Sequence, residues 1–102
     1  MTHPSGLLDD VIHQRVRLGI MAVLAEADEA EFTFLKDQLD LTDGNLNRHL
    51  QVLEDAGFIA RRRGRSAGRP RTWIRATRSG RTALADHLET LQRLIDQTKG
   101  TP

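Results

Sequence analysis

The chain lacks cysteine throughout its 102 residues, which excludes a disulfide framework and a thiolate metal site. Aromatic residues are also few, with three phenylalanines, one tryptophan and no tyrosine, so leucine, isoleucine and valine must fill most of a core. No stretch approaches the roughly 18 apolar residues that span a bilayer. Residues 1–10 lack the basic and apolar regions of a signal peptide. We therefore expect a cytoplasmic protein without membrane binding.

Acidic residues are missing from one long segment. None lies between Asp55 and Asp86, whereas nine arginines fall between Arg61 and Arg81. The formal net charge is only +1, because the first 55 residues carry four basic and eleven acidic side chains and the remainder carry eleven basic and three acidic ones. A surface of one sign attracts polyanions, whereas a merely soluble surface usually mixes both signs. This arrangement favours a nucleic-acid partner.

The periodicity of apolar residues predicts a single domain over residues 1–102, of the α+β class and mostly α. Residues 64–71 contain Gly, Ser and Pro, and we expect an extended loop there, too long for a two-residue hairpin turn. The predicted elements are a helix from Asp9 to about Ala25, a very short strand at Glu31-Phe32, a short helix capped by Thr33, a helix over 43–56, strands over 58–63 and 72–76, and a helix over 77–97 capped by Thr77. This order is that of a winged helix-turn-helix.

The helix predicted over residues 43–56 has the clearest signals. Thr42 is a good N-cap, and Leu46, Leu50 and Leu53 form one apolar stripe. Arginine can donate two hydrogen bonds to guanine, while asparagine and glutamine can pair bidentately with adenine. A polar outer face that only solvates the helix is the alternative. The candidate DNA contacts on this recognition helix are Thr42, Gly44, Asn45, Asn47, Arg48 and Gln51.

The arginine-rich segment that follows is expected to form a β-wing. Arg65 and Arg69 should lie at its tip, where arginine can enter a narrow minor groove. The candidate DNA contacts on the wing are Arg61, Arg63, Arg65, Arg69 and Arg71. A charged patch for solubility, a membrane surface and RNA are alternatives, although RNA modules usually need exposed aromatics and only Trp73 is a candidate. We expect Ile74 in the core, with Trp73 on the outer side of its strand or against the first helix.

Apolar residues at the two ends of the chain favour a homodimer. Those of the last helix repeat at spacings of four, three and four, which forms a narrow seam. The predicted dimer interface comprises Leu8, Val11, Ile12, Leu84, Leu88, Leu91 and Ile95. In such a dimer the two recognition helices would lie roughly 34 Å apart, one turn of DNA.

Nothing in the sequence indicates a catalytic or metal site. His13, Asp86, His87 and Glu89 are not at a recognised metal spacing, and we expect His49 to be a packed, hydrogen-bonded residue. No nucleophile, base and acid stand in a catalytic arrangement. We therefore predict no enzyme activity, no metal and no cofactor. A winged helix used only for protein interactions remains the alternative from another class.

Several segments, taken in order, resemble the small winged-helix regulators related to MarR. They are residues 17–21, 32–36, 41–50, 53–59, 68–73 and 77–81. The resemblance implies a homodimer that binds a palindromic operator in double-stranded DNA and represses or activates transcription. It also implies that the recognition helix carries Gly44, Asn45, Asn47 and Arg48, and that the wing carries Arg65, Arg69 and Arg71. Full-length MarR proteins are longer, with extra helices at both ends, and commonly have Asp before the wing arginine, where this chain has Ala67-Gly68.

Overall fold

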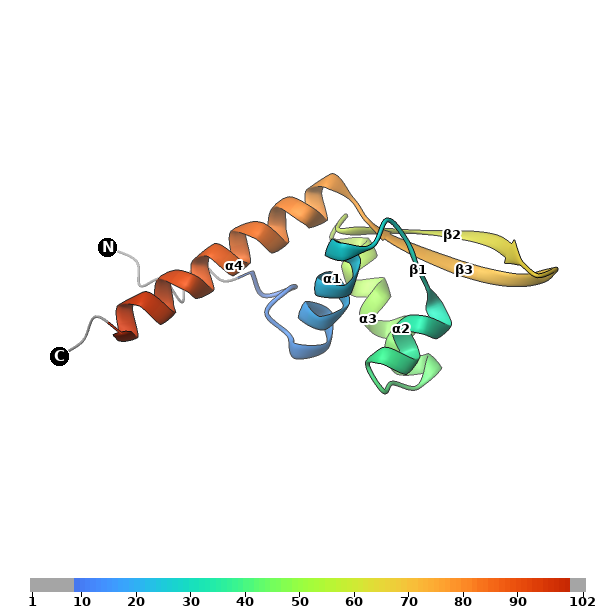
Figure 1. The fold of residues 1–102 in the computed structure, drawn as a ribbon, viewed down its shortest axis with the longest axis horizontal. Coiled ribbons are helices and arrows are strands. Elements are labelled where there is room, and N and C mark those ends of the chain that lie inside the picture. The colour runs from blue at the N-terminus through green and yellow to red at the C-terminus, as the bar shows by residue number, and fades with distance from the viewer. Residues whose placement is uncertain (1–8, 100–102) are drawn as a thin grey trace.

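A computed structural model describes residues 9–99, and its elements follow the order of a winged helix (Figure 1). The elements are α1 (Arg15–Glu26), β1 (Ala30–Glu31), α2 (Phe32–Gln38), α3 (Asp43–Asp55), β2 (Ile59–Ser66), β3 (Arg69–Ala76) and α4 (Arg78–Lys99). The expected α+β, mostly helical winged helix-turn-helix is therefore confirmed. Within residues 9–99, no helix combines the length and apolar content needed to cross a membrane.

One antiparallel sheet of three strands, in the order β1-β3-β2, joins the wing to the body. β1 pairs only with the inner part of β3, where Ala30 lies opposite Ile74. β2 and β3 pair along their full length, from Ile59 opposite Ala76 to the end of the hairpin. The hairpin and α4 extend from the helical body in opposite directions (Figure 1).

The tip of this hairpin corrects the expectation of a long loop over residues 64–71. The strands continue to Ser66 and resume at Arg69, so only Ala67 and Gly68 form the turn. Their φ angles are 54° and 78°, and two positive φ angles are what a type I′ hairpin turn requires. Pro70 fits inside β3 because β1 covers only the inner end of that strand, which leaves a free edge beside it.

α1 begins at Arg15, six residues later than predicted from Asp9. The Asp9 carboxylate accepts hydrogen bonds from the amides of Val11 and Ile12, at 2.9 and 3.3 Å, which fixes a separate turn before the helix. Gln14 then caps α1. The prediction failed because an aspartate that bonds to the amides following it supports a turn as well as a helix start.

The predicted caps of the other helices have mixed outcomes. Thr33 is not an N-cap, because α2 begins at Phe32 directly after β1. Thr42 and Thr77 are confirmed as caps, since each hydroxyl accepts a hydrogen bond from the amide three residues later, at 3.2 and 3.0 Å. These caps fix the starts of α3 and α4, which flank the wing.

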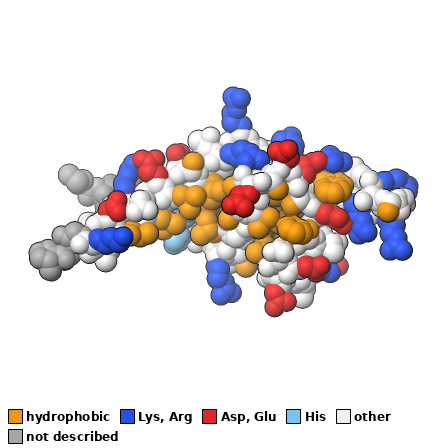
Figure 2. All heavy atoms as spheres, viewed as in Figure 1, with side chains coloured by type: hydrophobic (Ala, Val, Ile, Leu, Met, Phe, Trp, Pro, Cys, Tyr) orange, Lys and Arg blue, Asp and Glu red, His pale blue; other side chains and the backbone are white. Residues whose placement is uncertain are grey.

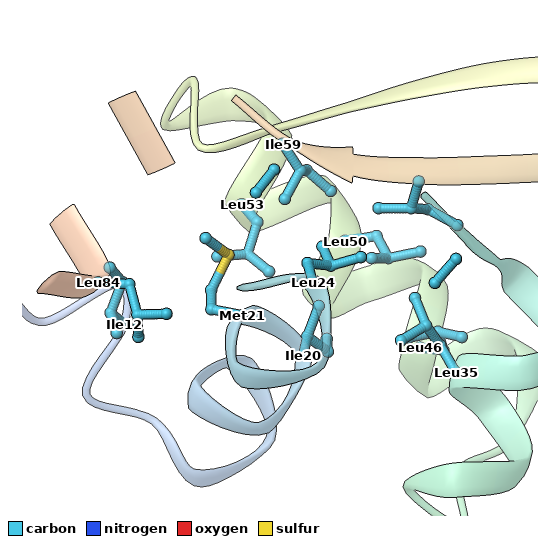
Figure 3. Packing of buried hydrophobic residues seen from close by; sticks show 13 residues of the cluster. Ile12, Ile20, Met21, Leu24, Leu35, Leu46, Leu50, Leu53, Ile59 and Leu84 are labelled. Atoms are coloured by element: carbon cyan, nitrogen blue, oxygen red, sulfur yellow. The ribbon is translucent and has the colours of Figure 1, made fainter. Parts of the chain in front are cut away.

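The core lies between the three-helix body, the sheet and the start of α4 (Figure 3). The predicted stripe on α3 is fully buried, and so is Ile74 on β3, as expected. The buried hydrophobic residues are Ile12, Ile20, Met21, Leu24, Ala30, Leu35, Leu46, Leu50, Leu53, Ile59, Ile74, Ala76 and Leu84. Because α3 contributes three of them from one side, its opposite side is turned outward.

Candidate nucleic-acid interface

The outer face of α3 presents the predicted recognition residues to solvent. Exposed side chains or backbone occur at Thr42, Gly44, Asn45, Asn47, Arg48 and Gln51. A Cβ atom built at Gly44 would meet nothing within 4 Å, so the backbone there is open to close approach. Within residues 9–99, the Arg48 side chain has no hydrogen-bond or ion-pair partner and is free to bind a ligand.

The register of the hairpin assigns its arginines to two faces. Residues directly opposite one another share a face, and side chains alternate along each strand. Arg61, opposite Ile74, therefore lies on the face that packs against the helical body, and Arg63 and Arg65 continue that face toward the tip. Residues 69 and 71 lie on the other face, with Trp73.

α3 and the base of the wing meet in one open groove of about 540 Å³. Its lining combines the first residue of α2, polar residues of the outer face of α3 and residues of both wing strands. They are Phe32, Asn47, Gln51, Arg61, Arg62, Arg63 and Thr72. The structure thus brings Asn47 and Gln51 of the predicted helix beside Arg61 and Arg63 of the predicted wing in one groove.

Arg61 forms the densest polar cluster of this groove. Its Nη1 donates to Asn47 Oδ1 at 2.7 Å, and its Nη2 donates to Gln51 Oε1 at 2.9 Å. The Glu54 carboxylate accepts from Arg61 Nη2 at 3.0 Å and from Nε at 3.3 Å. Gln51 in turn donates from Nε2 to Asp55 Oδ1 at 2.8 Å. Arg61 is therefore bonded to α3, whereas the sequence placed it among the DNA contacts of the wing.

Two other arginines of the basic segment form ion pairs with carboxylates near β1. Arg62 donates from Nε and Nη2 to Glu29 at 2.6 and 2.7 Å and lies 5.6 Å from the centroid of the Trp73 ring. The hydrogen bond from Arg62 lowers the pKa of Glu29. Arg71 pairs with Glu31 at 3.0 Å. Trp73 is half-buried on the outer side of its strand, one of the two expected positions.

Among the predicted DNA contacts of the wing, those without a carboxylate partner lie toward the tip. Arg63, Arg65 and Arg69 are exposed, and among the described residues none of them forms an ion pair. Arg65 donates to the carbonyl oxygen of Gly68 at 3.0 Å, a bond within the turn itself. Figure 2 shows the resulting group of basic side chains at the end of the hairpin. Positive charge is thus concentrated where the wing projects furthest.

His49 of α3 is half-buried and hydrogen-bonded to α1, as expected for a packed residue. Arg17 of α1 lies with Nη1 3.3 Å from His49 Nδ1, a distance at which the guanidinium donates to the ring nitrogen. Burial, followed by the positive charges of Arg17 and Arg48, lowers the pKa of His49. A neutral ring is required for this bond, because only the neutral ring has an acceptor nitrogen.

The structure brings His13 and His87 together, a pairing that was not predicted from the sequence. His87 is 1% exposed on α4, and its Nε2 lies 3.3 Å from Nδ1 of His13. The Asp9 amide points to His87 Nδ1 at 3.4 Å. Burial, followed by the nearby His13, lowers the pKa of His87, while Asp9 opposes the shift. Among residues 9–99, no group of three or more potential metal ligands occurs.

The residues predicted for a dimer interface have different environments. Ile12 and Leu84 are buried in the core of the chain itself, because α4 packs against α1 and the preceding turn. Leu88 and Ile95 are 49% and 46% exposed, while Val11 and Leu91 are half-buried. Leu8 lies outside the described residues. Figure 2 shows hydrophobic side chains in a band over α4 and α1.

An apolar hollow of about 220 Å³ adjoins this band. It is lined by Met21, Ala25, Ala76, Arg81, Leu84, Ala85 and Leu88. The exposed residues of the predicted interface, Leu88 and Ile95, thus lie on the outer side of α4, and Leu88 also lines this hollow.

Sequence reasoning missed the cluster around Arg61, although one signal was present. Asn47, Gln51 and Glu54 follow at spacings of four and three and therefore share one side of α3. A carboxylate in such a polar stripe indicates an internal cationic partner rather than a contact with phosphate. The partner itself comes from a strand whose distance from α3 depends on the tertiary fold.

Comparisons with known proteins give concordant results. A family model described as a winged helix DNA-binding domain matches residues 16–95. An uncharacterized protein from Methanocaldococcus jannaschii is 37% identical over 84 residues, which cover 82% of this chain and 91% of that protein. The solved structure of a transcriptional regulator homologue from Pyrococcus horikoshii is 36% identical with a TM-score of 0.81, covering 86% of this chain and 87% of the other. The transcriptional regulator BldR from Sulfolobus solfataricus has a similar fold, with a TM-score of 0.70 at 20% identity, over 83% of this chain and 60% of its own.

Proposed function

We propose that this protein, which belongs to the family of winged helix DNA-binding domains, regulates transcription in the cytoplasm by binding a palindromic operator as a homodimer. The family and fold agree with the resemblance to MarR-related regulators. In this proposal α3 enters the major groove and the wing contacts phosphates and the minor groove. The protein acts by binding and has no enzymatic activity.

The observation that carries the proposal is the shared surface of α3 and the wing. The free guanidinium of Arg48 and the open backbone at Gly44 lie on the exposed side of α3, and Asn47 and Gln51 of the same helix line the groove shared with the hairpin. Further along, the tip carries Arg65 and Arg69 without neutralising carboxylates. A helix suited to base edges beside a cationic ribbon is the arrangement that winged helices use on a duplex.

The exposed half of α4 supports the homodimer. Leu88 and Ile95 are two of the large hydrophobic side chains that the described residues leave open to solvent, and both lie on one seam. A second copy of the chain packed against this seam would bury them and pair the two recognition helices on successive major grooves. A palindromic operator follows from the two-fold symmetry of such a dimer.

Arg48→Ala tests base recognition. We expect this variant to lose about 1–3 kcal/mol on the preferred duplex and much less on unrelated duplexes, because a bidentate arginine contact discriminates among bases. Selection from random duplexes, followed by binding titrations, measures both effects. Arg93→Ala is the matched control, since Arg93 lies on α4 in an exposed pair with Glu89. Equal losses on all duplexes would contradict base recognition, and absence of salt-dependent duplex binding would favour a protein-interaction module.

A further inference from the structure

We infer that Arg17 of α1 binds a backbone phosphate of the DNA on the flank of α3 opposite the wing, with His49 as a second donor to the same phosphate. The inference rests on the proposed function, because it concerns a duplex that receives α3 in its major groove. Neither residue is among the DNA contacts predicted from the sequence. The ligand is a phosphate diester, so the contact carries no base preference of its own.

The order of side chains around α3 places His49 away from the wing. Successive residues of an α-helix are rotated by about 100°, so His49 lies about 160° from both Asn47 and Gln51. Those two side chains are bonded to Arg61 of β2. The exposed Arg48 lies between the two flanks, about 100° from Asn47 and from His49. The outward side of α3 is therefore bordered by the wing on one flank and by His49 on the other.

Arg17 reaches this second flank from α1. Its Nη1 donates to His49 Nδ1 at 3.3 Å, and its Nε donates to the carbonyl oxygen of Val11 at 2.5 Å. Both acceptors are uncharged, because a protonated imidazole has no acceptor nitrogen. No carboxylate within residues 9–99 forms an ion pair with Arg17. Its positive charge is therefore not compensated, whereas that of Arg61 on the other flank is paired with Glu54.

Arg17 and His49 both retain hydrogen-bond donors for a ligand. A guanidinium has five N–H groups, and Nη2 of Arg17 has no partner in the described part of the chain. Because Nδ1 of His49 accepts, the neutral ring carries its proton on Nε2, and that N–H group has no partner there either. Both side chains are half-buried, so part of each is open to solvent. One positive charge and donors from two mutually bonded side chains suit a phosphate oxygen.

Arg48 adds a second positive charge beside the same ring. Burial lowers the pKa of His49 most, and the positive charges of Arg17 and Arg48 lower it further. Neither arginine has a carboxylate partner among the residues that the structure describes. Like charges that lie close together without a counter-charge repel one another, and a bound anion would relieve that repulsion.

The dimensions of the major groove place a phosphate strand along each flank of α3. The groove is about 12 Å wide, and an α-helix with its side chains is about 10–12 Å across. A helix that enters the groove is therefore bordered by one phosphate strand on each side. When the wing contacts the strand on its own flank, the other strand lies next to Arg17 and His49.

Binding to the preferred duplex and to unrelated duplexes, measured against salt concentration, tests the inference. Arg17→Met and Arg17→Gln remove the charge, while Arg17→Lys keeps the charge and loses the guanidinium. Arg93→Met is the matched control, because Arg93 is an exposed arginine of α4 paired with Glu89. Arg17→Gln can still donate to the Val11 carbonyl, so it serves as the neutral variant if Arg17→Met does not fold.

We expect both neutral variants to reduce the salt slope by about one. They should bind every duplex about fivefold more weakly or worse near 0.1 M salt, since a slope of about 0.9 per contact amounts to about eightfold between 1 M and 0.1 M. Arg17→Lys should keep most of the wild-type slope, because lysine binds phosphate as a point charge. Arg93→Met should keep all of it. His49→Leu, which removes an uncharged donor, should weaken binding without changing the slope.

Single neutral methylphosphonates, placed one at a time along both strands of the preferred duplex, locate the contact. One such substitution should weaken the binding of wild-type protein and of Arg69→Ala but not that of Arg17→Met. A substitution on the strand across the major groove should weaken the binding of wild-type protein and of Arg17→Met but not that of Arg69→Ala. The two positions then identify the two flanks of α3.

Three results overturn the inference while the proposed function stands. The first is a wild-type salt slope in both Arg17→Met and Arg17→Gln. The second is an equal loss of binding in Arg17→Lys and Arg17→Met, which would mean that the side chain acts only through its bonds within the protein. The third is a methylphosphonate scan in which no position distinguishes Arg17→Met from wild-type protein.

Two other outcomes have separate meanings. Wild-type affinity in His49→Leu would overturn the assignment of this ring as a phosphate donor. If wild-type protein binds duplexes without any salt dependence, the proposed function itself fails, and the inference fails with it.

Discussion

A pair of glycine substitutions tests the packing that orients the wing. The structure predicts that one lowers the free energy of unfolding and that the other leaves it unchanged or raises it. Gly80 lies in the first turn of α4, and a Cβ atom there would lie 2.0 Å from the carbonyl oxygen of Phe58 and 2.8 Å from its carbon. The same oxygen accepts a hydrogen bond from the Thr77 amide at 3.0 Å. The start of α4 is therefore pressed against the backbone that leads into β2.

The expected change in the free energy of unfolding for Gly80→Ala follows from two opposing effects. Alanine gains about 1 kcal/mol over glycine from helix propensity. Overpacking typically costs about 1–3 kcal/mol and sometimes more, and here the obstacle is backbone that cannot rotate away. We expect a net loss of at least about 2 kcal/mol in the free energy of unfolding. Gly44→Ala is the control, because its Cβ atom would meet nothing within 4 Å.

Urea unfolding followed by circular dichroism measures both variants. Gly44→Ala should be neutral or gain up to about 1 kcal/mol from helix propensity, yet bind DNA more weakly if the backbone at residue 44 approaches a phosphate. A Gly80→Ala variant as stable as wild-type protein would refute the packing described for α4. A loss of stability in Gly44→Ala would refute the exposure of that side of α3.

Two further predictions concern pH and assembly. Burial lowers the pKa of His87, so its contribution to stability should be present above the ordinary value of 6.5 and decline as pH falls below it toward the folded pKa. The free energy of unfolding of His87→Asn should therefore differ less between pH 7.5 and pH 5.5 than that of wild-type protein. An equal difference would contradict the burial of that ring. Leu88→Glu should be a monomer by sedimentation at micromolar concentration. Its free energy of unfolding should change by no more than about 0.5 kcal/mol, because the side chain is half-exposed. A wild-type monomer, or a variant that stays dimeric, would contradict a dimer interface on this seam of α4.

Local signals in the sequence were sufficient for the element order and for the inner face of α3. The spacing of Leu46, Leu50 and Leu53 and the caps at Thr42 and Thr77 are properties of a few adjacent residues, and the structure contains all of them. The hairpin turn was harder to predict, because Ala67 adopts a positive φ that alanine seldom adopts without tertiary support.

Pairings between distant residues could not be predicted from local patterns. The acidic first half and the basic second half of the chain appeared as separate blocks, but folding brings Glu29 against Arg62 and Glu31 against Arg71. Fewer wing arginines are consequently available to a ligand than the arginine count indicated, because Arg61, Arg62 and Arg71 are already paired with carboxylates. Arg61, predicted as a DNA contact of the wing, also donates hydrogen bonds to Asn47 and Glu54 of α3, and no local pattern in the sequence assigned these bonds to Arg61.

The salt dependence of duplex binding tests the central claim most directly. The logarithm of the binding constant should fall linearly with the logarithm of salt concentration, and Arg65→Ala and Arg69→Ala should each reduce the slope by about one while weakening binding to all sequences. Arg93→Ala, on the exposed part of α4, should leave the slope unchanged. A wild-type slope near zero, or slopes that the two wing variants do not alter, would contradict a cationic wing acting with α3 on DNA.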